Sequence, residues 1–118
     1  MILKLSPQVR DFNKIWYDIT ENKITATIND ISDIFDFTDM PNGELQMRDE
    51  DGNSLIETTL DEVPILSANK VDGVLTVEIL FSIDVSEQDD RLLFPKPMTL
   101  DEFHVLMKEL AKREKEVK

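Results

Sequence analysis

The longest alternation of apolar and polar side chains limits this chain to a β-rich fold. Along Val74–Ile83, one face of an extended segment carries only apolar side chains: Leu75, Val77, Ile79, Phe81 and Ile83. A period of two residues is that of a half-buried strand. Asp72-Gly73 stands just before it and suits a two-residue hairpin turn. We therefore predict that Ile65–Lys70 pairs with this strand, and that Leu75, Val77, Ile79 and Phe81 form the centre of the core.

The glycines mark further turns. The chain has three, and each follows Asn or Asp, at Asn42-Gly43, Asp51-Gly52 and Asp72-Gly73. Such pairs accept the positive φ that turns between antiparallel strands need. Pro41 is expected to open the turn at Asn42-Gly43. Other strands are predicted from alternation over 15–19, 24–28 and 31–37, with a turn at Asn29-Asp30, and over a hairpin of 45–47 with 55–59.

The C-terminal region changes to a helical period. Its apolar residues recur every three or four positions: Leu100, Phe103, Leu106, Met107 and Leu110. Thr99 and Glu102 match the T-x-x-E capping box of a helix start. Residues 107–118 hold five basic and three acidic side chains, whereas residues 1–106 hold eight basic and 22 acidic. We predict one α+β domain, mainly antiparallel β over residues 1–97, with a capped C-terminal α-helix over residues 98–118.

Composition narrows the functional classes. The net charge of −12 disfavours binding to a nucleic-acid backbone, which needs clustered Lys and Arg. The absence of cysteine excludes disulfides, thiolate zinc sites and cysteine nucleophiles. The apolar run after Met1 is too short for a signal peptide, and no later run could span a bilayer. We therefore expect no membrane contact, and a location in the cytosol or in an exported assembly.

No combination of residues predicts catalysis or a cofactor. The single histidine, His104, has no nucleophile or second histidine near it in sequence, so we expect a solvated residue at the rim of the helix. The acidic run Asp49–Asn53 resembles a calcium loop, but its glycine and twelfth residue do not fit the EF-hand spacing. No nucleotide-binding, hydrolase or metalloprotease motif is present. We predict a protein that is not an enzyme, with no catalytic, cofactor or metal residues.

The large apolar side chains indicate where a partner could bind. Trp16 is expected on the strand face opposite Ile15 and Tyr17, and tryptophan is common at interface hot spots. A second core layer or the underside of the C-terminal helix is the alternative for Trp16. The helical stripe either closes the core of its own domain or contacts another subunit. Phe35 and Phe37 share one strand face and are expected in the core. The candidate interaction residues are therefore Trp16, Phe103, Met107 and Leu110.

Four blocks of sequence carry a family resemblance. In chain order they are K-L-S-P-Q-V-R-D at 4–11, F-D-F-T-D-M-P-N-G at 35–43, V-D-G-V-L-T-V at 71–77 and F-P-K-P at 94–97. Together they resemble short phage and prophage proteins encoded among tail and tail-fibre genes. The second block is the most specific. The acidic segment at 48–54 and the helix after Pro97 are additions to that pattern.

The resemblance implies a role in the phage tail region and no catalytic residues. The expected function is that of a minor virion component or an assembly module, acting by protein–protein interaction. The expected partners are phage structural proteins or a second copy of the chain. One alternative is an acidic inhibitor that occupies a basic site on a host or defence protein. Another is a carbohydrate-binding tail accessory, for which a cluster of exposed aromatic residues would be expected.

Overall fold

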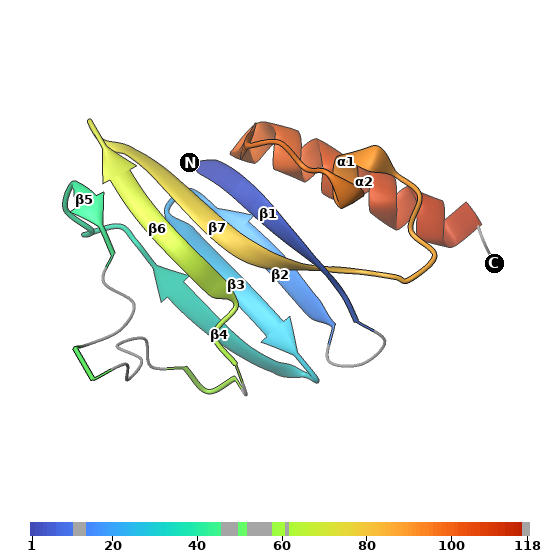
Figure 1. Cartoon of the computed structure of the whole chain (residues 1–118), viewed down its shortest axis with the longest axis horizontal. Coiled ribbons are helices and arrows are strands. Elements are labelled where there is room, and N and C mark those ends of the chain that lie inside the picture. Colours follow the sequence, from blue (N-terminus) through green and yellow to red (C-terminus); the bar gives the residue numbers. More distant parts are fainter. Residues whose placement is uncertain (11–13, 46–49, 52–57, 61, 117–118) are drawn as a thin grey trace.

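A computed structural model describes residues 1–10, 14–45, 50–51, 58–60 and 62–116, with side chains through Lys112. Its elements form an α+β fold that is rich in antiparallel strands and ends in an α-helix, as predicted (Figure 1). Among the described residues, no helix is long and apolar enough to cross a membrane.

The larger sheet contains the predicted hairpin. Its strands are β5 (Gly43–Glu44), β6 (Ile65–Val71), β7 (Val74–Ile83), β1 (Ile2–Val9) and β8 (Met98–Thr99), in that spatial order. Strands β6 and β7 are antiparallel, and Asp72 and Gly73 join them with φ of 50° and 81°. These positive values explain why an Asp-Gly pair stands at this turn.

The smaller sheet is an antiparallel meander. It consists of β2 (Ile15–Thr20), β3 (Lys23–Ile28) and β4 (Ile31–Asp36). Asn29 and Asp30 form the expected turn, with φ of 52° and 67°. This sheet lies behind the larger one in Figure 1, and apolar side chains of both sheets belong to one core.

The predicted core residues are buried. Leu75, Val77, Ile79 and Phe81 are between 0% and 8% exposed. Phe35 lies in β4 of the smaller sheet and is 8% exposed, and Phe37, just after the end of β4, is 6% exposed. The alternation read from the sequence therefore identified both the strand face and the layer that it packs against.

Strand β1 was not predicted, and it makes the larger sheet mixed. It pairs parallel to β7 from Ile2 opposite Thr76 to Val9 opposite Ile83. Leu3 and Leu5 are buried and alternate with Lys4 and Ser6, but Pro7 within the run argues against a central strand. Parallel strands are joined by long connections and not by a short turn, so no turn motif in the sequence indicates that β1 pairs with β7. The first block of the resemblance is thus mostly a central strand.

The expected turn at Asn42-Gly43 is different in the structure. The chain turns earlier, where Met40 N–H donates to the Phe37 carbonyl at 3.1 Å. Gly43, with φ of 121°, already belongs to β5. The segment is a crossover from the smaller sheet to the larger one and not a hairpin. The hairpin predicted for 45–47 and 55–59 lies mostly outside the described residues.

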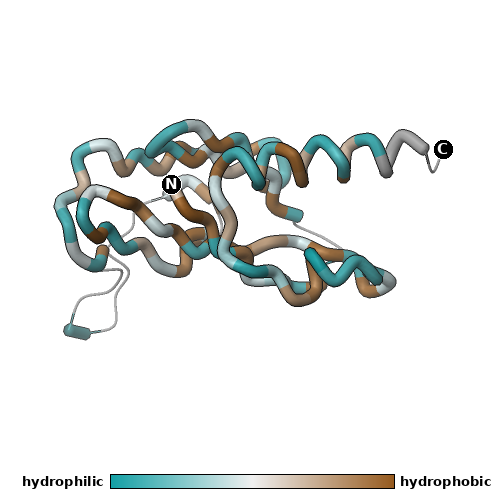
Figure 2. The backbone as a smooth tube through the Cα atoms, turned by 90° about the horizontal axis from the view of Figure 1, so that it is seen from above, coloured by the Kyte–Doolittle hydropathy of each residue, from teal (hydrophilic) through white to brown (hydrophobic). Residues whose placement is uncertain are grey.

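The C-terminal helix packs on its own chain. Before it comes the one-turn helix α1 (Asp90–Leu93), and α2 itself covers Leu100–Glu116. The capping box is confirmed: Thr99 N–H donates to Glu102 Oε1 at 3.0 Å, and Glu102 N–H donates to Thr99 Oγ1 at 3.2 Å. Leu100 N–H donates to the Met1 carbonyl at 3.2 Å, which anchors the first turn beside β1. The last turns extend past the sheets (Figure 2).

Candidate functional site

Three of the four predicted interaction residues meet in one groove. Trp16 comes from β2, and Met107 and Leu110 come from the middle of α2. They line a hollow of about 280 Å³, which we call the Trp16 groove. Its other lining residues are Lys14, Ile15, Tyr17, Phe81, Ser82, Ile83, Asp84, Glu87, Leu92 and Ala111.

The alternation of β2 exposes Trp16. Ile15 and Ile19 point into the core and are 5% and 2% exposed, whereas Trp16 is 59% exposed. Trp16 is thus a surface residue and does not belong to a second core layer, although it lines the groove together with Met107 and Leu110 of the helix. Met107 and Leu110 are half-buried, because α2 closes the side of the core next to β2. The groove therefore combines a large aromatic surface with a partly covered apolar floor.

Polar groups at the floor of the groove are engaged inside the protein. Ile15 N–H donates to Ser82 Oγ at 2.9 Å, and the Tyr17 hydroxyl donates to the Leu80 carbonyl. Burial raises the pKa of Tyr17, with Glu62 adding to the rise and Arg10 opposing it. Tyr17 is therefore a neutral phenol at physiological pH. At the rim, Lys14 and Asp84 form an ion pair at 2.8 Å.

Phe103 does not belong to this surface. Its side chain is 1% exposed and packs in the core with Leu106, which is 5% exposed. On this helix the stripe thus has two roles: the first residues close the core of the domain, and Met107 and Leu110 continue the stripe to the groove. Helical spacing could not separate these roles, because the position of β2 decides where the stripe leaves the core.

His104 has a structural partner. One of its ring nitrogens, Nε2, lies 2.8 Å from the Ile19 carbonyl at the end of β2. The imidazole therefore donates from Nε2, and it joins α2 to the smaller sheet. The exposed residue expected at the helix rim is present, with an anchoring contact that sequence spacing could not reveal.

The shifted pKa values have structural causes. The pKa of Asp33 is lowered, first by the Thr58 side chain and then by backbone N–H groups of Thr59 and Ile34. Hydrogen bonds from Thr38 lower the pKa of Asp36. Asp89 and Glu109 hold the pKa of Arg91 above its usual value. These groups tie neighbouring segments together, and the contacts that shift them come from the protein itself.

The part of the chain that the structure describes contains no cluster of side chains arranged to bind a metal ion. No group of three or more His, Asp or Glu residues there could hold a metal ion. Most of the acidic run Asp49–Asn53 lies outside the described residues. Within the described residues, no buried side-chain nitrogen or oxygen is without a hydrogen-bond partner.

The most specific block of the resemblance forms the corner between the sheets. We call residues 35–43 the sheet corner. Phe37 N–H donates to the Asn22 carbonyl at 2.7 Å, and Lys70 Nζ donates to the Met40 carbonyl at 3.0 Å. Asn42 Oδ1 accepts from Gly73 N–H at 3.1 Å. The block therefore links β4 to the hairpin of the larger sheet through hydrogen bonds, and these contacts give its residues a structural role.

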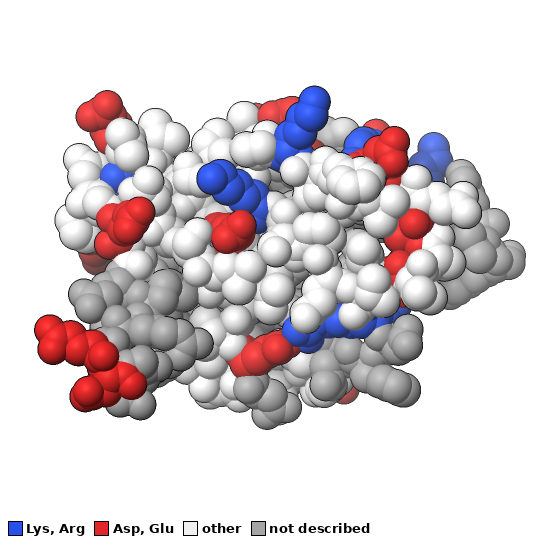
Figure 3. Space-filling view, in the orientation of Figure 1, with Lys and Arg blue, Asp and Glu red and all other residues white. Residues whose placement is uncertain are grey.

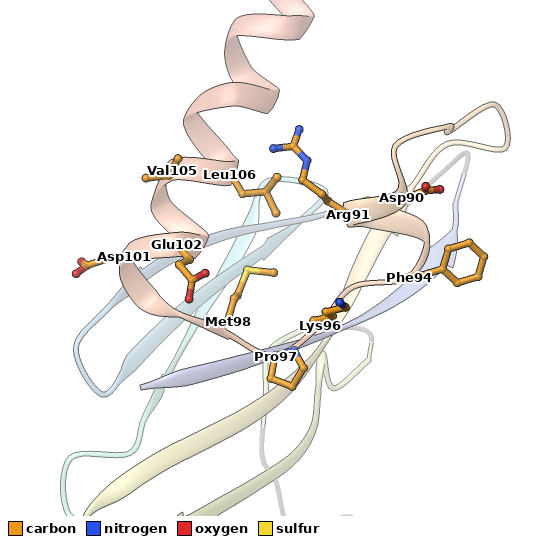
Figure 4. Close-up of a pocket in the computed structure, with 10 residues that line it drawn as sticks. All are labelled: Asp90, Arg91, Phe94, Lys96, Pro97, Met98, Asp101, Glu102, Val105 and Leu106. Atoms are coloured by element: carbon orange, nitrogen blue, oxygen red, sulfur yellow. The ribbon is translucent and has the colours of Figure 1, made fainter.

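A second groove was missed by the sequence reasoning. Between the segment 90–98 and the start of α2, a hollow of about 820 Å³ is lined by Asp90, Arg91, Phe94, Lys96, Pro97, Met98, Asp101, Glu102, Val105 and Leu106 (Figure 4). We call it the Phe94 groove. Phe94 and Val105 are 76% and 57% exposed. In the F-P-K-P sequence two prolines stiffen the link that carries Phe94, and an aromatic residue on such a link could have indicated a protruding contact.

Charge is dispersed on the face of the larger sheet. Figure 3 shows acidic and basic groups scattered around a largely uncharged middle of this face. Strand β1 places Lys4 directly opposite Glu78 of β7, so two of the charged residues in this sheet are neighbours of opposite sign. The acidity of the chain is thus not gathered into one patch on this side.

Comparison with known proteins gives no relative: no family model, curated protein or solved structure matches this chain.

Proposed function

We propose that this protein is a non-catalytic binding module that acts in phage tail assembly, and that the Trp16 groove holds an apolar segment of a partner protein. The observation that carries the proposal is the exposed Trp16 beside half-buried Met107 and Leu110. Tryptophan buries a large area with few torsions to fix, so it is favoured at the centre of protein interfaces.

The form of the groove supports a protein partner. Its volume of about 280 Å³ lies just below the roughly 300–1,000 Å³ typical of small-molecule pockets. An aromatic or aliphatic side chain of a partner would fit such a hollow, with Lys14 and Asp84 forming part of a polar rim. An apolar centre inside a polar rim is the usual anatomy of an interface.

The phage context is supported by the four blocks of sequence and their order along the chain. The sheet corner gives the most specific of these blocks a structural role. A protein that shares this block would therefore be expected to share the corner, whereas its partner-binding surface could differ. The candidate partners are the tail proteins encoded by neighbouring genes, and a second copy of the chain.

The experiment uses Trp16 as its own reporter. The chain has one tryptophan, so once the partner's own emission is subtracted, the emission excited at the tryptophan band comes from the groove. Each purified tail protein encoded nearby would be titrated into this protein. Burial of Trp16 by a partner should shift the emission to the blue. The affinity of the Trp16→Ala variant, measured by calorimetry, should fall by about 30-fold or more, the loss expected at a hot spot.

Ile34→Ala provides the matched control. Ile34 is 62% exposed and lies on β4, away from the residues of the groove. This variant should bind as the natural chain does. Equal affinities for Trp16→Ala and the natural chain would refute the groove. The acidic-inhibitor alternative has a different signature: binding would weaken steeply with salt and would not depend on Trp16.

A further inference from the structure

We propose that the partner segment held in the Trp16 groove carries acidic side chains next to its apolar anchor, and that Lys108 and Lys112 of α2 bind them. The inference rests on the proposed function, because it adds the charge of the partner to the same groove. It comes from the distribution of charge on α2. Basic side chains stand beside the Trp16 groove, and acidic ones stand beside the Phe94 groove.

Helical periodicity places Lys108 at the edge of the Trp16 groove. His104, whose Nε2 donates to the Ile19 carbonyl, marks the flank of α2 that faces β2. Ala111 lines the groove. Residues three and four positions apart are neighbours on the surface of a helix. Lys108 comes four positions after His104 and three before Ala111, so it lies between them, and Lys112 continues the row by one turn.

The acidic side chains of α2 are placed differently. Glu109 forms an ion pair with Arg91, which lines the Phe94 groove. Asp101 and Glu102 line the Phe94 groove themselves, and Asp101 is two turns before Lys108. In the part of α2 whose side chains the structure describes, the carboxylates therefore lie beside the Phe94 groove and not beside the Trp16 groove.

Lys108 has no neighbouring carboxylate to offset its charge. The residues one helical turn away from it, at positions 104, 105, 111 and 112, are His, Val, Ala and Lys. Among the described residues, neither Lys108 nor Lys112 forms an ion pair, and both are exposed. Two like charges four positions apart destabilise a helix. A carboxylate bound between the two ammonium groups would remove this repulsion.

The helix dipole does not account for Lys108. Cations stabilise the C-terminal end of a helix, but this effect is confined to about the last turn. Helix α2 ends at Glu116, so Lys112 is close to that turn, whereas Lys108 is about two turns away from the end. The position of Lys108 is better explained by the groove beside it.

The other charged groups of the groove are already bound inside the protein. Lys14 and Asp84 pair with each other, and the Glu87 carboxylate accepts from the backbone N–H groups of the next two residues. The whole chain carries a net charge of −12. At physiological salt, however, exposed charges are screened beyond about 8 Å. The charges nearest the groove therefore decide which segment it accepts.

The first test uses three synthetic peptides as probes. Each is free of tryptophan and has the same core of leucine and phenylalanine, flanked by Glu, by Gln or by Lys. The blue shift of Trp16 emission measures binding at about 0.15 M salt. The Glu-flanked peptide should bind about three- to tenfold more tightly than the Gln-flanked one, the gain expected from two exposed ion pairs, and the Lys-flanked peptide should bind most weakly. At about 1 M salt the Glu-flanked and Gln-flanked peptides should bind alike.

The second test removes the two cations. Lys108→Gln should reduce the preference for the Glu-flanked peptide, and the double variant Lys108→Gln/Lys112→Gln should abolish it. Lys96→Gln is the matched control for the single variant. It removes the same charge from the chain, but Lys96 lines the Phe94 groove, so the preference should be kept. Circular dichroism would confirm that α2 is intact in all of these variants.

The outcomes separate this inference from the proposed function. Equal binding of the three peptides would overturn the inference and leave the groove as a site for an apolar segment of any charge. A preference for the Lys-flanked peptide would also overturn it, as would a preference for Glu that survives in the double variant. If no peptide shifted the Trp16 emission up to about 1 mM, the inference would fail, and the titrations with tail proteins would still decide the proposed function.

Discussion

The sheet corner and the Trp16 groove use their side chains in opposite ways. In the corner, Phe35 and Phe37 are buried, Asp36 binds Thr38, and Asn42 accepts from the N–H of Gly73. In the groove, Trp16 keeps 59% of its surface exposed. The side chains of the sheet corner are thus committed to contacts inside the protein, whereas the Trp16 groove leaves apolar surface exposed.

The contrast between the sheet corner and the Trp16 groove shows which residues inform about the fold and which inform about a partner. A crossover between sheets needs particular residues at particular positions, because buried rings and turn hydrogen bonds leave few alternatives. A contact surface needs only a large side chain that the alternation of a strand turns outward. A motif such as the one at 35–43 is therefore informative about the fold, while the partner must be sought at residues that the fold leaves uncovered.

The largest expected effect is in the core that both regions share. Val77 is 0% exposed, and Val77→Asp would bury an unpaired charge, which costs several kcal/mol. We expect loss of the folded state in circular dichroism at room temperature. Val74→Asp is the matched control, since Val74 is on the same strand but 52% exposed. Similar melting curves for the two variants would show that β7 is not the centre of the core.

The next prediction compares the replacement of an aromatic residue by alanine in the sheet corner and in the Trp16 groove. Phe37→Ala removes a ring that is 6% exposed and should lower the free energy of unfolding by about 3–5 kcal/mol. Trp16→Ala removes a larger but mostly exposed ring and should cost no more than about 1 kcal/mol. Urea denaturation of both variants measures this difference. If Trp16→Ala were the more damaging change, Trp16 would be a core residue and not a contact residue.

Local patterns in the sequence were enough to predict much of the fold. The β6–β7 hairpin, the three strands β2 to β4 with the turn between β3 and β4, and the capped helix were predicted, because each depends on neighbouring residues. The pairing of β2 with β3 was not predicted. Nor was the parallel partner of β7. Its pairing with β1 follows from where the chain returns in space, and Pro7 within the short alternating run of β1 argued against a central strand.

The candidate site was predicted in part for the same reason. Alternation placed Trp16 outside, and helical spacing selected Met107 and Leu110, but only the packing of α2 brought these residues together. Phe103 satisfies the same helical pattern and lies in the core. The Phe94 groove escaped prediction because its walls come from the link between α1 and α2, where no periodic pattern exists.

The smallest predicted effect tests whether the sheet corner responds to pH. Asp36 Oδ1 accepts the Thr38 N–H at 2.9 Å and also the Thr38 hydroxyl. The hydroxyl is the larger cause, and the N–H the next, of a folded-state pKa below the usual value. Because folding lowers this pKa, the ionised carboxylate stabilises the folded state above the unfolded pKa of about 3.9. That stabilisation is lost as the pH falls through the folded pKa.

The measurement compares urea midpoints of the natural chain and Asp36→Asn between about pH 2 and pH 7. The natural chain should have a slightly higher midpoint at neutral pH, and the difference should shrink below about pH 4. Thr38→Val keeps the backbone N–H but removes the hydroxyl. It should therefore keep part of the stabilisation and lose it at a higher pH than the natural chain. A difference between the natural chain and Asp36→Asn that stays constant down to the lowest pH would mean that the Asp36 carboxylate does not stabilise the corner.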